Sequence, residues 1–196
     1  MRARDRAALL GGALGIAVQV GDRLLVARAM RSRPRDEHAV DRSEVVAASS
    51  PFYLVPAAGS VVAFAANRSR RDRGRAAVEP MTAIGLVVAG FALRTWTLET
   101  LGEFYSPIVE VRSDHRVVTG GPYRFVRHPG YLAGLMQSLG VGMAFSGLIG
   151  AASVVASWLA VFLPRIREEE QVLSSTLGDE YRNFCAQRAR LLPGVW

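Results

Sequence analysis

Residues 131–163 have the sequence YLAGLMQSLGVGMAFSGLIGAASVVASWLAVFL, which contains no charged residue. The small residues Ser146 and Gly147 divide this stretch into two apolar segments, 131–145 and 148–163. Because almost nothing separates the segments, we expect them to form a tight antiparallel helical hairpin. Small residues let helix backbones approach closely in lipid, and here they include Gly134, Gly140, Gly142, Gly147, Gly150, Ala151, Ala152 and Ser153.

Three further apolar segments precede the hairpin, at residues 7–20, 45–66 and 77–98. A membrane-spanning helix needs about 20 apolar residues. The second segment has that length, whereas the first is short and can be extended only across Asp22 and Arg23. The basic N-terminus resembles a signal peptide, but no small-residue cleavage site follows, so we expect a retained membrane segment. Without an alternating strand pattern, the sequence predicts an all-α, polytopic membrane helix bundle of about five transmembrane segments.

From Arg165 onward the sequence becomes charged and amphipathic. Its apolar residues recur at helical spacing, namely Val172, Leu173, Leu177, Tyr181 and Phe184. We therefore expect a helical tail packed against one membrane face. The hairpin returns the chain to its starting side, so the connection 99–129 and the tail should share the Arg-richer, cytoplasmic compartment. The Arg-rich loop 67–75 and the basic N-terminus fall on the opposite side in this arrangement.

The 24 basic residues are all Arg and give a formal charge of +7 in a chain of 196 residues. Arg neutralises phosphates in nucleic-acid complexes. Here, however, Arg residues cluster at the edges of apolar runs, where they can snorkel and meet anionic headgroups. Membrane lipids, and not nucleic acids, are therefore the expected partners. The single cysteine, Cys185, excludes an intrachain disulfide and a Cys-based metal site, and we expect no metal.

The densest functional pattern is GPYRFVRHPGY at residues 121–131. Pro129 suits the first turn of a helix, because no backbone N–H is wasted there, so it should begin the first arm of the hairpin. Arg127, His128 and Tyr131 then gather at the helix start, where spacings of three and four residues place side chains on one face. Free amides and an adjacent Arg at a helix N-terminus attract carboxylates and phosphates.

The second pattern is RIREEE at residues 165–170, which follows the other arm of the hairpin. The hairpin should return it close to residues 127–131. Adjacent helical residues point about 100° apart, so at most two of the three glutamates can face one pocket. We favour Glu169 and Glu170 for the site and assign Glu168 to solvent. A cationic helix start opposite a carboxylate-rich helix end could hold a zwitterion. S-adenosylmethionine is such a molecule, with a carboxylate, an amine and a sulfonium.

Roughly the last hundred residues resemble the isoprenylcysteine carboxyl methyltransferase family in several elements and in their order. The elements are LRTW at 93–96, LG at 101–102, HRVV at 115–118, GPY at 121–123, RHPGY at 127–131, RI at 165–166, EE at 169–170, Leu173, GDEY at 178–181 and RLLPG at 190–194. Phospholipid N-methyltransferases share the general layout. The resemblance implies N-terminal membrane helices at 1–98 and a methyltransferase catalytic region at 99–196.

The resemblance further implies a cavity for S-adenosylmethionine at the cytoplasmic end of the bundle. It implies that Arg165 reaches toward the methyl acceptor and that Glu170 supports Arg165, with Glu169 as the third catalytic residue. The residues that it implies for cofactor binding are His115, Val117, Val118, Tyr123, Arg127, His128, Tyr131 and Glu169. The acceptor would be a lipophilic small molecule or lipid that enters from the bilayer, for example the carboxylate of an isoprenylcysteine.

Two other functions remain open at this point. Membrane sterol and enone reductases have a similar His–Pro–Tyr region but use NADPH. A non-enzymatic membrane scaffold explains the apolar segments but leaves residues 121–131 without a reason. Individual residues also have structural explanations: His128 can cap its helix, Tyr123 and Tyr131 can lie at the membrane interface, and the glutamates can form a solvated helix face.

Overall fold

A computed structural model of the chain describes residues 3–31, 54, 58, 80–106 and 116–194. Within these ranges it contains helices α1 (Ala3–Arg31), α3 (Pro80–Leu101) and α4 (Pro129–Ala186), with the short 3-10 helices η1 (Gly102–Phe104) and η2 (Gly121–Arg124) before α4. The described residues form no β-strand; the one strand-like contact that they show is an isolated bridge between Val126 and Ala189. The predicted all-α class is confirmed.

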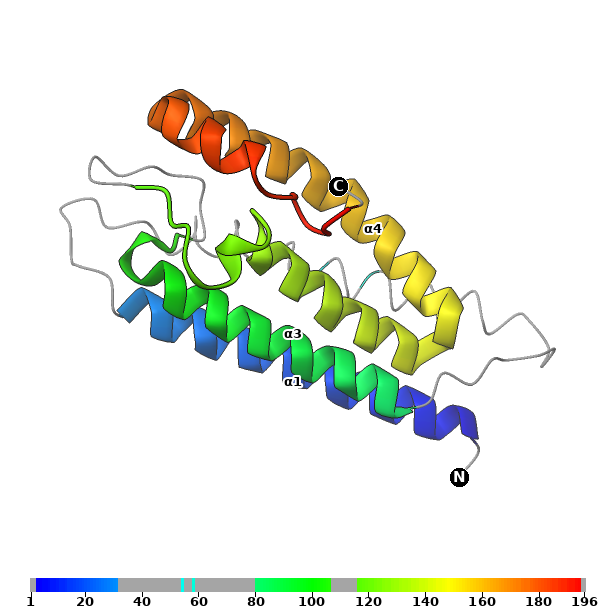
Figure 1. The fold of residues 1–196 in the computed structure, drawn as a ribbon. Coiled ribbons are helices and arrows are strands. Elements are labelled where there is room, and N and C mark those ends of the chain that lie inside the picture. Colours follow the sequence, from blue (N-terminus) through cyan, green and yellow to red (C-terminus); the bar gives the residue numbers. More distant parts are fainter. Residues whose placement is uncertain (1–2, 32–53, 55–57, 59–79, 107–115, 195–196) are drawn as a thin grey trace.

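Helix α4 reverses its direction twice (Figure 1), so we divide it into arm A (129–145), arm B (148–177) and arm C (179–186). The first reversal gives the predicted hairpin. A Cβ atom at Gly142 would lie 2.8 Å from the carbonyl oxygen of Gly150, so glycine is what allows the two arms to approach. The second reversal occurs at Gly178, whose φ of +58° lies in the left-handed region that glycine adopts without strain. The sequence did not predict this second turn.

Arm A packs against both N-terminal helices along their length. Val18 of α1, Val87 of α3 and Val141 of arm A form one buried cluster. A Cβ atom at Gly90 would lie 2.9 Å from the carbonyl oxygen of Ala133, so α3 and arm A are in close backbone contact. The packing follows the small-residue pattern of membrane helix pairs.

Helix α1 is longer than the sequence predicted. The expected segment ended at residue 20, because Asp22 and Arg23 interrupt the apolar run, whereas the helix continues to Arg31. Asp22 is buried and forms an ion pair with Arg94 of α3 at 2.9 Å. The pairing satisfies a charge that would be costly alone in an apolar interior, and this explains why the helix can pass through it.

Within the part of the chain that the structure describes, three helical stretches are long and apolar enough to cross a membrane: Leu9–Arg31, Met81–Phe104 and Leu148–Ala186. Large apolar side chains on them are exposed, including Leu9, Ile16, Leu24, Met81, Val88 and Leu148. Such a surface suits lipid better than water. These helices support an integral membrane protein. The expected segment 45–66 and the Arg-rich loop 67–75 lie outside the described residues.

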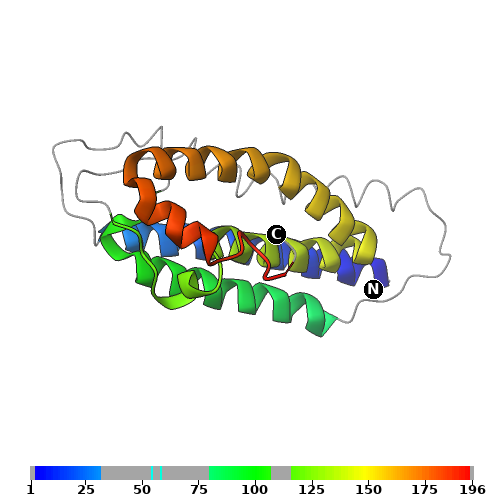
Figure 2. The same cartoon turned by 45° about the horizontal axis from the view of Figure 1, so that its top comes forward.

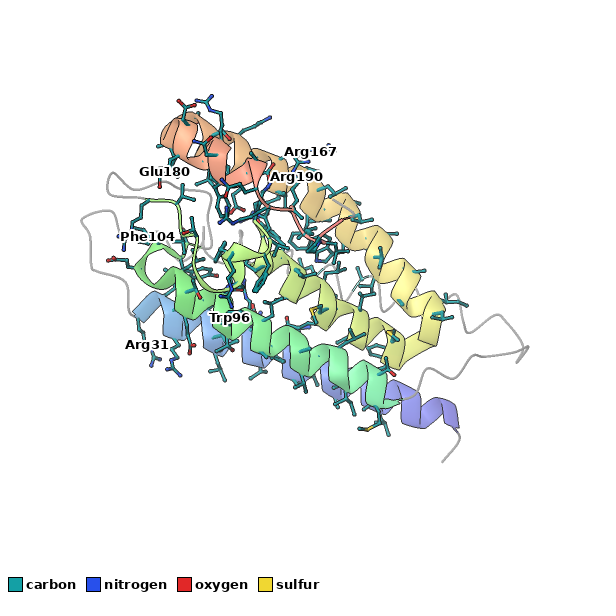
Figure 3. All side chains as sticks on the ribbon, viewed as in Figure 1. Arg31, Trp96, Phe104, Arg167, Glu180 and Arg190 are labelled. Atoms are coloured by element: carbon teal, nitrogen blue, oxygen red, sulfur yellow. The ribbon has the colours of Figure 1, made fainter. Side chains whose placement is uncertain are left out.

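The elements that carry the functional patterns meet at one end of the bundle. In Figure 3, Arg31 at the end of α1, Phe104 of η1 and Glu180 of arm C lie at the same end, opposite the N-terminus. In the turned view of Figure 2, arm B arches over the other helices and arm C descends toward the start of arm A. Residues far apart in the sequence are thereby gathered at this end.

Candidate active site

One buried carboxylate, that of Glu170, organises the junction between the two ends of α4. Its Oε1 accepts a hydrogen bond from Arg127 Nη1 at 3.0 Å and lies 3.2 Å from His128 Nε2. Its Oε2 accepts from Arg190 Nε at 2.9 Å. Glu170 is 8% exposed, and a carboxylate so deeply buried requires such charged partners. Each oxygen of the Glu170 carboxylate thus has at least one polar partner at this junction.

The same junction joins the segment after arm C to the start of arm A. Arg127 Nε donates to the backbone oxygen of Arg188 at 2.8 Å, and its Nη2 donates to that of Cys185 at 2.7 Å. The backbone N–H groups of Arg127 and His128 donate to the carbonyl oxygens of Ala189 and Arg190 at 2.9 and 3.1 Å. All three guanidinium nitrogens of Arg127 thus bind protein groups. They join the start of arm A to the segment after arm C, and these two segments form one wall of the site.

A second polar chain runs beside the first and is centred on Tyr131. The Tyr131 hydroxyl donates to Glu169 Oε2 at 2.9 Å and accepts from Arg165 Nε at 3.0 Å. Its ring meets those of Trp158 and Phe162 edge-on, with centroids 6.4 and 5.6 Å away. An aromatic core therefore fixes the ring, and the ring holds an arginine and a carboxylate in a defined geometry.

The three consecutive glutamates separate as their helical positions predict. Glu168 is exposed, Glu169 is half-buried on Tyr131, and Glu170 is buried on Arg127 and His128. The predicted support of Arg165 by Glu170 is not among the contacts that Glu170 makes here, which go to Arg127, His128 and Arg190. Tyr131 holds Arg165 instead.

Tyr123 enters the same region from η2. A Cβ atom on Gly121 would collide with the Thr100 hydroxyl, and Gly121 has a φ of +53°, so glycine brings η2 against α3. Burial raises the pKa of the Tyr123 phenol above its ordinary value, the Glu169 carboxylate raises it further, and the Arg94 charge lowers it. The Tyr123 phenol is therefore neutral and can donate a hydrogen bond, and the charge of Glu169 acts on it.

A cleft of about 420 Å³ lies at the end of α3, and no residue of the two polar chains is part of its lining. Its lining combines the end of α3 with η1 and the segment before η2, namely Thr100, Leu101, Gly102, Glu103, Phe104, Arg116, Val117, Val118 and Thr119. Val117 N–H donates to Glu180 Oε1 of arm C at 3.3 Å, and the Arg116 guanidinium lies 5.5 Å from the centroid of the Phe104 ring. Arm C thus helps to hold this wall in place.

The structure brings most of the predicted site residues together. The two polar chains contain most of them: Arg127, His128, Tyr131, Arg165, Glu169 and Glu170. Tyr123 is affected by the charge of Glu169, and Val117 and Val118 line the separate cleft at the end of α3. His115 lies outside the described residues. Sequence reasoning missed Arg190, which had been noted only as part of the RLLPG ending. It also missed the partnership of Asp22 with Arg94, which two opposite charges inside apolar segments could have indicated.

Comparison with known proteins finds similarity to isoprenylcysteine carboxyl methyltransferases. Residues 83–175 match the model of the isoprenylcysteine carboxyl methyltransferase family. Protein-S-isoprenylcysteine O-methyltransferase of Tribolium castaneum is 32% identical over 151 residues, which cover 74% of this chain and 53% of that protein. The Schizosaccharomyces pombe protein of the same name is 31% identical over 105 residues, 53% of this chain and 44% of that protein.

A solved structure has a similar fold over most of this chain. It is that of a eukaryotic intramembrane Ras methyltransferase, isoprenylcysteine carboxyl methyltransferase, with a TM-score of 0.62 and 24% identity, covering 93% of this chain and 68% of that one. The chain spans about half the length of the curated relatives that it matches. These matches favour the methyltransferases over the reductase alternative. The resemblance predicted from the sequence is thus confirmed: this chain is similar in sequence and in fold to the isoprenylcysteine carboxyl methyltransferase family.

Proposed function

We propose that the chain is an integral membrane methyltransferase that transfers a methyl group from S-adenosylmethionine to the carboxylate of a lipophilic, isoprenylcysteine-like acceptor. The observation that carries this proposal is the Arg165–Tyr131–Glu169 chain at the end of an apolar hairpin. In this chain Arg165, whose guanidinium can bind an acceptor carboxylate, lies beside Glu169, whose carboxylate can bind a cation. A scaffold would not require such a pair at a membrane surface.

The residues present fit S-adenosylmethionine by the chemistry of their groups. The half-buried Glu169 carboxylate offers a partner for an ammonium or sulfonium. The neutral Tyr123 phenol offers a hydrogen-bond donor. The cleft at the end of α3, which Val117 and Val118 line, has a volume of about 420 Å³, within the range of small-molecule pockets. When bound, the cofactor supplies a methyl group that its sulfonium already activates.

The protein's own contribution is then to orient the acceptor and to exclude water. Arg165 can bind an acceptor carboxylate through two parallel hydrogen bonds, while Tyr131 fixes its guanidinium from one side. A carboxylate is a nucleophile at neutral pH, so no general base is needed. Trp158 and Phe162, both almost fully buried, pack against the Tyr131 ring.

In this proposal Glu170 is a positioning residue. It binds Arg127, His128 and Arg190, and so fixes the wall against which the cofactor lies. Arg127 and His128 remain proposed cofactor-site residues, acting through this wall. The division into membrane helices at 1–98 and a catalytic region at 99–196 also stays a proposal, and so do five spans, with residues 45–66 as the second.

The distribution of Arg supports a cytoplasmic active site. Arg28 and Arg31 are exposed in the last turn of α1, and Figure 3 shows Arg31 at the end of the bundle that also holds Phe104 and Glu180. The segments that carry the site bear further exposed arginines, namely Arg116, Arg124, Arg167 and Arg182. Positively charged residues are enriched on the cytoplasmic side of membrane proteins. These side chains can also meet anionic lipid headgroups, and an acceptor with a prenyl chain would reach Arg165 from the bilayer.

Calorimetric titration of the detergent-purified full chain tests the donor. We expect S-adenosylhomocysteine to bind and NADPH not to bind, and binding of NADPH alone would reverse the choice of enzyme. A Glu169→Gln variant should fold and bind S-adenosylhomocysteine more weakly, because it loses the charge but not the shape. The matched control is Glu168→Gln on the exposed face of the same helix, which should bind like the wild type.

A further inference from the structure

A buried ion pair links α1 to the candidate site. Arg94 Nε of α3 donates to Asp22 Oδ1 of α1 at 2.9 Å, and the two side chains are each 8% exposed. Opposite charges within membrane helices are expensive to bury and commonly serve function. Asp22 precedes residue 83, where the match to the family model begins, so the family pattern assigns it no part.

The Arg94 side chain extends from Asp22 toward the start of α4. Its Nη2 lies 3.5 Å from the Tyr105 hydroxyl, and its guanidinium carbon lies 5.8 Å from the centroid of that ring. A Cβ atom added to Gly130 would lie 3.1 Å from Arg94 Nη1. The guanidinium therefore touches the first turn of arm A, directly between His128 and Tyr131 in the sequence.

Arg94 also acts electrostatically on the phenols of the site. Burial raises the pKa of Tyr105, and burial followed by Glu169 raises that of Tyr123, while the Arg94 charge lowers both. One cation thus opposes the effect of the Glu169 carboxylate at Tyr123. A guanidinium can do this only if it stays in place, and Asp22 is the group that holds it.

We propose that the Asp22–Arg94 pair is a positioning element of the methyl-donor site, in which Asp22 fixes the Arg94 guanidinium against Tyr105 and the first turn of arm A. The inference rests on the proposed function and extends the site to α1. The competing explanation is that the pair only joins two membrane helices. The two differ in a measurable way, because a purely structural pair affects stability without a selective effect on cofactor affinity.

The test uses the full chain in detergent and two readouts, the melting temperature and the Kd for S-adenosylhomocysteine. The paired variant Asp22→Asn/Arg94→Gln removes both charges and can keep a hydrogen bond between the two side chains. Arg94→Lys keeps the charge but not the planar fork. Val87→Ala is the matched control: it weakens the packing of the same three elements, about two turns of α3 away from Arg94.

The proposal predicts that the paired variant raises the Kd about tenfold or more, that Arg94→Lys raises it less, and that Val87→Ala leaves it within about twofold at a comparable loss of melting temperature. A paired variant with an unchanged Kd would overturn the inference and leave the proposed function standing. If the paired variant does not fold, Arg94→Lys decides, because a folded Arg94→Lys with wild-type Kd would refute positioning by the fork. Wild-type protein that binds no S-adenosylhomocysteine would overturn the proposed function itself.

Discussion

Tyr131→Phe is the substitution that isolates the chemistry of the proposed site from its packing. It removes the hydroxyl that accepts from Arg165 at 3.0 Å and donates to Glu169 at 2.9 Å. The ring keeps its edge-on contacts with Trp158 and Phe162. The aromatic packing is therefore kept, and Arg165 and Glu169 each lose one hydrogen-bond partner.

The magnitude follows from the two hydrogen bonds that are lost. A hydrogen bond to a charged group contributes about 1.5–3 kcal/mol. Arg165 and Glu169 are half-buried and partly regain water, so we expect a total loss of about 2 kcal/mol, or about 4–8 °C in melting temperature. If the orientation of Arg165 is worth a similar amount in the transition state, kcat/KM falls about 30-fold.

The assay is transfer of a labelled methyl group to N-acetyl-S-farnesylcysteine, with kcat and KM measured separately. Phe162→Leu is the matched control, since it changes the packing against the Tyr131 ring and leaves both hydroxyl hydrogen bonds. We expect that control to lose stability while keeping kcat/KM within about fivefold. A Tyr131→Phe enzyme with kcat/KM within about twofold of wild type would refute the role given to the Arg165–Tyr131–Glu169 chain.

Further predictions concern the junction and the two reversals of α4. Glu170→Gln removes the charge shared by Arg127, His128 and Arg190, so we expect a lower melting temperature and faster proteolysis after residue 186, both measured against Glu168→Gln. Gly178→Ala places a Cβ at a φ of +58° and should cost about 1–2 kcal/mol, seen as a lower melting temperature, and a rise would contradict the turn. Gly142→Val would drive a side chain into the Gly150 carbonyl, so folded yield after detergent extraction should fall sharply, whereas a full yield would argue against the close hairpin.

The sequence predicted the membrane helices better than it predicted the polar contacts between them. The run at 131–163 gave the hairpin because a charge-free sequence with small residues has few other ways to pack. Helical geometry predicted that at most two of the three glutamates at 168–170 can share one face, and the structure places Glu168, Glu169 and Glu170 exposed, half-buried and buried in turn. Local periodicity was sufficient for both.

Contacts that depend on long-range register could not be predicted in this way. Arg190 reaches Glu170 only because the chain turns back at Gly178. A single glycine in an amphipathic stretch is not enough to predict that a helix reverses its direction there. The pairing of Asp22 with Arg94 depends on how α1 and α3 are aligned, which no periodicity within either helix encodes. The hydrogen bond from Arg165 to Tyr131 depends likewise on how the two arms of the hairpin are aligned.

The most direct test of the account is methyl transfer by the purified wild-type chain from labelled S-adenosylmethionine to N-acetyl-S-farnesylcysteine. A carboxyl methyl ester is hydrolysed by base, whereas an N-methyl group is not, so the lability of the product identifies the acceptor atom. We predict base-labile label on the prenylated acid and none on its carboxamide analogue. Label on the carboxamide, a base-stable product, or no transfer by protein that binds S-adenosylhomocysteine would contradict a carboxyl methyltransferase acting on a prenylated acid.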